Sequence, residues 1–194
     1  MARGLSLGAS MAQRSIYLAG PEVFLPNAAE IGAAKVALCA EFGFVGLYPG
    51  EAGEPLPTET AALVAELYAR CLRMMARADL IVANLTPFRG PSGDVGTAFE
   101  LGYMAALRKP CFAYSNVAED LLARSKRFDP MIVRKGSDWV DGNGLTVEDF
   151  GQFDNLMLPG GLAAPAVCRA VPAAERYTNL EAFRACLALA RDKP

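Results

Sequence analysis

The feature that most constrains the fold of this chain is a series of short, continuous apolar runs. The clearest run is Leu80 to Leu85 (LIVANL), and similar runs occur at Ser15 to Ala19, Phe44 to Tyr48 and Cys111 to Tyr114. A strand is apolar along its whole length when helices cover both faces of its sheet. We therefore expect an α/β fold with a parallel sheet and right-handed helical crossovers.

The stretches between the runs have the spacing and the end signals of helices. Asn27 can cap a helix because its side chain can accept hydrogen bonds from the free amides of the first turn, and Asp94 can do the same. The predicted helices cover 27–41, 58–76, 94–108 and 179–190. Residues 51–57 contain two prolines and a glycine and predict a loop. The pattern is irregular from 115 to 159.

Size and charge indicate one soluble domain that does not bind a nucleic-acid polymer. The chain has 194 residues, which is the size of a single domain. We expect a flexible tail over 1–14 and one domain over 15–194. The 19 Lys and Arg residues nearly balance the 21 Asp and Glu residues, so the basic surface typical of nucleic-acid binding is not expected.

The absence of histidine limits the chemistry that the chain can perform. With no histidine in the sequence, Ser-His-Asp and Cys-His catalysis and His-ligated metals are excluded. The five cysteines contain no CxxC pair, and we interpret them as reduced core residues. We expect no metal and no cofactor. No run of about 18 apolar residues occurs, so we expect a cytoplasmic protein without a membrane span.

Ligands of open parallel sheets bind beyond the carboxyl ends of the strands. This rule selects the segments 20–24, 48–57 and 84–94. The candidate substrate-binding residues within them are Gly20, Phe24, Asn84 and Phe88. No GxGxxG follows the first strand and no GxxxxGK[ST] occurs, so the dinucleotide and P-loop hypotheses have little support.

Glu100 is the charged residue of an otherwise apolar helical stretch, VGTAFELGYMAAL. A carboxylate there either faces solvent or is paired in a cleft, because unpaired burial costs free energy. Asp94 is explained fully as an N-cap, although it also lies at the ligand edge. Tyr17 is either a core aromatic or a residue of the cleft. Asp79 precedes its strand and lies at the opposite edge, so we interpret it as structural.

Three segments of the chain resemble the nucleoside 2-deoxyribosyltransferases. They are IYLAGPEVF (16–24), ADLIVANLTPFRGPSGDVGTAFELGYM (78–104) and EDFGQFDNLML (148–158). The D-x-G-x-x-x-E-L-G-Y pattern at 94–103, together with NLM at 155–157, is the most specific part. The resemblance implies a flavodoxin-like or Rossmann-like sheet of about five strands flanked by helices, and transfer of a 2′-deoxyribosyl group between nucleobases without a cofactor.

The resemblance also implies a role for each matching residue. Glu100 would be the nucleophile, Asp94 would contact substrate and help to protonate the departing base, and Tyr17 would orient the glutamate. Asn155 and Met157 would reach the sugar in a neighbouring subunit, which requires a homo-oligomer, at least a dimer, with shared active sites. Family members often carry Asp or Asn where this chain has Arg70-Cys71, so base preference does not follow.

General carboxylate chemistry supports the same reaction independently of the family resemblance. A carboxylate can trap C1′ of a nucleoside as a glycosyl ester, as in retaining glycosidases, and a carboxylic acid can protonate the leaving base. The partners would be deoxyribonucleosides and free nucleobases. Two alternatives remain: an N-glycosidase, in which water takes the ester, and a module that binds a nucleoside derivative without turnover. The scarcity of cations at the strand ends, with Arg89 as the exception, argues against a 5′-phosphate.

Overall fold

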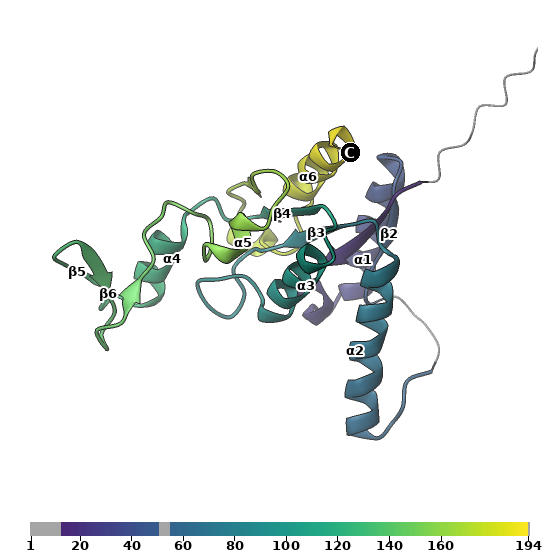
Figure 1. Cartoon of the computed structure of the whole chain (residues 1–194), viewed down its shortest axis with the longest axis horizontal. Helices are drawn as coiled ribbons and strands as arrows, with labels where there is room; N and C mark the ends of the chain where they lie inside the picture. Colours follow the sequence, from purple (N-terminus) through teal and green to yellow (C-terminus); the bar gives the residue numbers. More distant parts are fainter. Residues whose placement is uncertain (1–12, 51–54, 194) are drawn as a thin grey trace, which may run out of the picture.

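A computed structural model describes residues 13–50 and 55–193 of the chain. Its main feature is a five-stranded sheet with the order β2-β1-β3-β4-β8, in which every neighbouring pair is parallel (Figure 1). The strands are β1 (Ser15–Ala19), β2 (Val45–Leu47), β3 (Leu80–Asn84), β4 (Cys111–Ser115) and β8 (Val167–Cys168). The predicted α/β sheet of about five strands is confirmed.

Helices cover both faces of this sheet, as the continuous apolar runs predict. The helices are α1 (Ala28–Glu41), α2 (Thr60–Arg77), α3 (Val95–Ala106) and α6 (Glu181–Asp192), with 3-10 turns η1 (Pro21–Phe24) and η2 (Ala173–Glu175). Side chains alternate along each strand, so Leu18 packs with α1 and α6 whereas Tyr17 packs with α2 and α3. Every residue of β3 is fully buried between the two layers.

The stretch that follows β4, where the sequence pattern is irregular, forms short elements that the sequence did not predict. It contains α4 (Leu121–Phe128), the antiparallel strands β5 (Val133–Lys135), β6 (Asp138–Val140) and β7 (Thr146–Val147), and the single turn α5 (Met157–Gly160). In Figure 1, α4, β5 and β6 project from the main sheet. These strands are short and largely exposed, so they carry no long apolar period that sequence analysis could detect.

Local predictions near the helix ends differ in detail from the structure. Asn27 stands at the N-cap position of α1, but its side chain makes no capping hydrogen bond, so the predicted cap interaction is wrong. Glu59 instead caps α2, accepting from the amides of Ala61 and Ala62 at 3.0 and 2.7 Å. Glu59 lies two residues after Pro57, and its carboxylate reaches two free amides at once.

The structure tests the predictions for Asp79 and for part of the N-terminal tail. Asp79 accepts hydrogen bonds from the backbone and hydroxyl of Ser15 at 2.7 and 2.8 Å, so its structural role is confirmed. Of the predicted tail, residues 1–12 lie outside the described residues, whereas Arg14 donates to backbone carbonyls at the end of α6. Loop residues 51–54 also lie outside them. Over residues 13–50 and 55–193, no helix combines the length and apolarity needed to cross a membrane.

Candidate active site

Tyr17 and Glu100 meet between β1 and α3. Tyr17 is fully buried on the face of β1 that packs against α2 and α3, and its hydroxyl donates to Oε1 of Glu100. Glu100 is half-buried. The apolar helix therefore packs a carboxyl group against a phenol rather than exposing a solvated glutamate. The same alternation that buries Tyr17 in the core aims its hydroxyl at Glu100.

Burial sets the electrostatics of this pair. Loss of solvation is the main cause that raises the pKa of Glu100 to about 7, the hydrogen bond from Tyr17 opposes it, and the charge of Asp94 raises it further. Burial, followed by the charge of Glu100, also raises the pKa of Tyr17 well above its usual range. The phenol therefore keeps its proton and acts as a donor to the carboxylate.

Asp94 is the N-cap of α3. Its Oδ2 accepts from the Thr97 amide at 2.9 Å and from the Thr97 hydroxyl at 3.1 Å, which confirms the predicted cap. Its charge is also felt by Glu100. The two carboxyl groups, at the N-cap and in the middle of α3, thus belong to one electrostatic environment.

Cys71, which the sequence marks only as part of a departure from the family pattern, lies beside Tyr17 and Glu100. It lies on α2, and it is near enough to Tyr17 and Glu100 for the three groups to affect each other's pKa. Burial raises the pKa of the Cys71 thiol. The thiol is therefore a neutral neighbour of the Tyr17-Glu100 pair.

A buried polar cluster lies next to the carboxyl ends of β1, β3 and β4. Oε1 of Glu22, which is 1% exposed, accepts hydrogen bonds from Lys35, Asn84 and Tyr114, each at 2.9 Å. A Cβ on Gly20 would lie 1.9 Å from Oε2 of Glu22, so this carboxylate requires glycine there. Sequence analysis missed Glu22, although Lys35 on the apolar stretch AAKVALCA was a signal that a buried partner existed.

Asn84 belongs to this cluster as well as to the ligand edge. It is fully buried, its amide nitrogen donates to Glu22, and its amide oxygen accepts from both the backbone and the hydroxyl of Thr86. Its side chain is therefore occupied by protein partners. The substrate contact of Asn84 stays a prediction.

Phe24 and Phe88 form an aromatic platform at the ends of β1 and β3. Their rings stack with centroids 5.4 Å apart, and Phe24 is 55% exposed. The Arg89 guanidinium lies 5.2 Å from the Phe24 ring centroid and 4.7 Å from that of Phe88, and Tyr177 packs edge-on against Phe88. An exposed ring with a cation beside it can stack on a flat aromatic ligand.

Asn155 and Met157 lie in the segment that follows β7. The side-chain amide of Asn155 donates to the Glu148 carboxylate, and Met157 is 74% exposed. The neighbouring Asp154 accepts from the backbone amide of Gly93, directly before Asp94. The structure thus brings the two sequence motifs together at one point. In the described ranges, no group of His, Cys, Asp and Glu side chains could hold a metal ion.

Comparison with known proteins identifies the family. The family model for nucleoside 2-deoxyribosyltransferases matches residues 16–157, which is most of the chain. The chain belongs to this family. The match includes Tyr17, Asp94 and Glu100, and it ends at Met157.

Relatives of this deoxyribosyltransferase-family chain span nearly its whole length. The uncharacterized protein C191.05c of Schizosaccharomyces pombe is 34% identical over 188 residues, covering 89% of this chain and 86% of its own. The structure of a 2-desoxiribosyltransferase from Leishmania mexicana has 29% identity and a TM-score of 0.63, covering 93% of this chain and 98% of its own. A conserved protein from Enterococcus faecalis V583 shares the fold, with 19% identity, a TM-score of 0.50, and 92% and 99% coverage. Family and structure together support an enzyme of the deoxyribosyl-transfer class.

Proposed function

We propose that this protein transfers a 2′-deoxyribosyl group from one nucleobase to another through a glycosyl ester on Glu100. The observation that carries the proposal is the half-buried Glu100 carboxyl group, which accepts a hydrogen bond from Tyr17 and lies within the segment that matches the family model. A desolvated carboxylate is a stronger nucleophile than a hydrated one, and a fixed hydrogen bond keeps it in one orientation.

The reaction proceeds by two displacements at C1′. A carboxylate oxygen of Glu100 forms a bond to C1′ as the bond from C1′ to the base nitrogen breaks, and the electron pair of that bond leaves with the base. Asp94 helps to deliver the proton that neutralises the departing base. A second base then attacks C1′ through a ring nitrogen, gives up the proton of that nitrogen through Asp94 and releases the Glu100 carboxylate, so both the enzyme and the original configuration are restored.

Tyr17 supports both displacement steps without reacting itself. Its hydroxyl keeps its proton, because burial and the charge of Glu100 raise its pKa. It therefore donates to Glu100 throughout the cycle and leaves the other carboxylate oxygen for C1′. The hydrogen bond also stabilises the ionised form of Glu100 against the cost of burial.

The aromatic platform supports a nucleobase as ligand. Phe24 lies at the carboxyl edge of β1, stacked on Phe88, and is 55% exposed. Base stacking on such a ring contributes about 1 to 3 kcal/mol and tolerates any base. We propose that Phe24 and Phe88 contact the base. Gly20 and Asn84 stay predicted substrate contacts, and both pack against the buried Glu22 side chain at this edge.

We further propose that the active unit is a homo-oligomer, at least a dimer, in which Asn155 and Met157 complete a neighbouring site. Leu156 and Met157 are 44% and 74% exposed although both are apolar. Beside them is an open hollow of about 400 Å³, lined by Phe150, Gln152, Leu156, Pro159 and Gly160. Exposed apolar surface of this kind marks a contact region, and closed symmetric assembly is the rule for homo-oligomers.

The test is to incubate the protein with deoxyinosine and either free adenine or free cytosine, and to separate the products. Formation of a new deoxynucleoside supports the transferase, whereas hypoxanthine and deoxyribose without a new nucleoside support the N-glycosidase. Glu100→Ala is the control, and we expect its kcat to fall at least about 10³-fold. Binding without turnover by the wild type, unchanged in Glu100→Ala, would support the non-catalytic module instead.

A further inference from the structure

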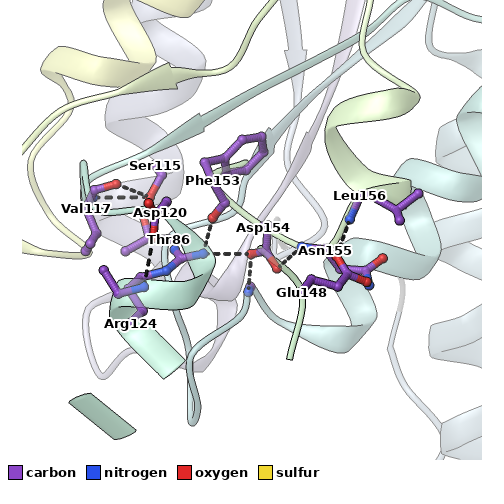
Figure 2. A network of polar contacts seen from close by, with 12 residues as sticks. Thr86, Ser115, Val117, Asp120, Arg124, Glu148, Phe153, Asp154, Asn155 and Leu156 are labelled. Carbon is purple, nitrogen blue, oxygen red and sulfur yellow. Dashed lines mark hydrogen bonds and ion pairs between the residues drawn. The ribbon is translucent and has the colours of Figure 1, made fainter. Parts of the chain in front are cut away.

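Asp154 lies at the junction between two segments that carry proposed site residues. Its side chain is fully buried. Oδ2 accepts from the Gly93 amide at 2.9 Å, and Oδ1 accepts from the Asn155 amide at 2.8 Å. Figure 2 shows this carboxylate beside Asn155, in the segment that leads from Phe153 to Leu156. The Asp154 side chain therefore binds the backbone of Gly93, which lies 61 positions earlier in the chain.

Each of the two bonds is made next to a residue of the proposed mechanism. Gly93 immediately precedes Asp94, the cap of α3, and Asn155 is itself one of the predicted sugar contacts. Beyond Asn155, Glu148 holds the same segment by accepting from the Asn155 side chain and from the Leu156 amide (Figure 2). The segment is thus fixed from both sides, by Asp154 within the protein and by Glu148 at its surface.

Arg124 of α4 holds Asp154 in turn. Its Nη2 donates to the carbonyl of Phe153 and lies 3.6 Å from Oδ2 of Asp154. Arg124 is 2% exposed, and its Nε and Nη1 atoms have no hydrogen-bond partner. Burial lowers the pKa of Arg124, and the charge of Asp154 is the main influence that opposes this. The arginine therefore depends on this carboxylate for its charge balance.

We propose that Asp154, held by Arg124, is a positioning residue that sets the start of α3 and the Asn155-to-Met157 segment in one relative position. This inference rests on the proposed function, because it treats Asp94 and Asn155 as substrate contacts. Asp154 does not touch the reacting atoms. It acts through backbone amides on both sides, and a displacement of about 1 Å at such a site can cost on the order of 10²-fold in rate.

The first test is Asp154→Asn in the full-length protein. Asparagine keeps one acceptor oxygen but cannot receive both amides on separate carboxylate oxygens, and it leaves Arg124 without its counter-charge. We expect kcat/KM per folded molecule to fall about 10- to 100-fold. Asp120→Asn is the matched control, since it makes the same change at the exposed N-cap of α4 near Arg124, where Asn caps as well as Asp, and it should leave kcat and KM unchanged.

The double variant Arg124→Gln with Asp154→Asn separates positioning from stability. Removing both charges relieves the uncompensated arginine, so the thermal stability lost in Asp154→Asn should recover at least in part. Activity should stay low, because the two amides still lack their joint acceptor. Recovery of kcat/KM together with stability would overturn the proposal, since the pair would then serve stability alone.

Hydrogen exchange gives a readout that does not depend on turnover. We expect Asp154→Asn to speed amide exchange in peptides from both 90–97 and 153–158, whereas a purely local role would change the second peptide alone and overturn the inference. Wild-type turnover in the same assay keeps the two hypotheses apart. An inactive wild type contradicts the proposed function, whereas an active wild type matched by Asp154→Asn contradicts only the positioning role.

Discussion

Replacing Glu100 by Gln should make the protein more stable and inactive at the same time. Gln has the same shape, and its amide oxygen can still accept from the Tyr17 hydroxyl. The change removes the charge that burial penalises. Catalytic groups held in unfavourable environments commonly lower stability in this way.

The magnitude follows from the pKa of Glu100, which rises from 4.5 to about 7 on folding. A carboxyl group whose pKa is higher in the folded protein binds its proton more tightly there. Its contribution to stability is therefore present below pH 4.5 and is lost as the pH rises through 7. Linkage gives a loss of about 3 kcal/mol at pH 8 and of less than about 1 kcal/mol at pH 5. Partial exposure of the side chain makes these values upper limits.

Thermal unfolding at pH 5 and pH 8 measures the effect. For a chain of this size, about 1 kcal/mol corresponds to a Tm change of roughly 2 to 4 °C. We expect Glu100→Gln to raise the Tm by up to about 10 °C at pH 8 and by much less at pH 5. Glu30→Gln, at an exposed position of α1, is the control and should change the Tm little at either pH. An equal gain at both pH values, or none at pH 8, would refute the argument that Glu100 is desolvated.

Three further predictions concern activity. The kcat/KM of the wild type should rise with pH, with a midpoint near pH 7, because Glu100 must be ionised to attack C1′. Tyr17→Phe removes a hydrogen bond that lowers the pKa of Glu100, so it should move this midpoint to higher pH. An unchanged midpoint would contradict Glu100 as the group that titrates. Asp94→Asn keeps the cap of α3 but cannot supply a proton, so circular dichroism and Tm should stay normal while kcat falls; unchanged activity per folded molecule would leave Asp94 as a cap only. Mixing Glu100→Ala with Asn155→Ala subunits should restore part of the activity if sites are shared, whereas no recovery despite proven subunit exchange, or an active monomer in sedimentation, would rule out shared sites.

The layered sheet and the position of its ligand edge could be predicted from local sequence. A continuous apolar run such as Leu80 to Leu85 is stable only between two helical layers. Gly20-Pro21 ends the first strand and Pro49-Gly50 follows the second. The cap at Asp94 and the unusual carboxylate at Glu100 were visible for the same reason, because each stands out against its own few neighbours in the chain. Alternation along Ser15 to Ala19 also implied that Tyr17 and Leu18 face opposite layers.

Contacts between distant segments were decided only by the tertiary structure. Glu22 receives hydrogen bonds from residues 13, 62 and 92 positions away, and Asp154 reaches back 61 positions to Gly93. The last strand, β8, has two residues and is stable only because β4 pairs with it. Apolar periodicity indicates which face of a helix or strand is buried. A buried ion pair or a two-residue strand depends instead on which distant residues the fold brings within about 3 Å. The residues next to it in the sequence carry no pattern that predicts such a contact.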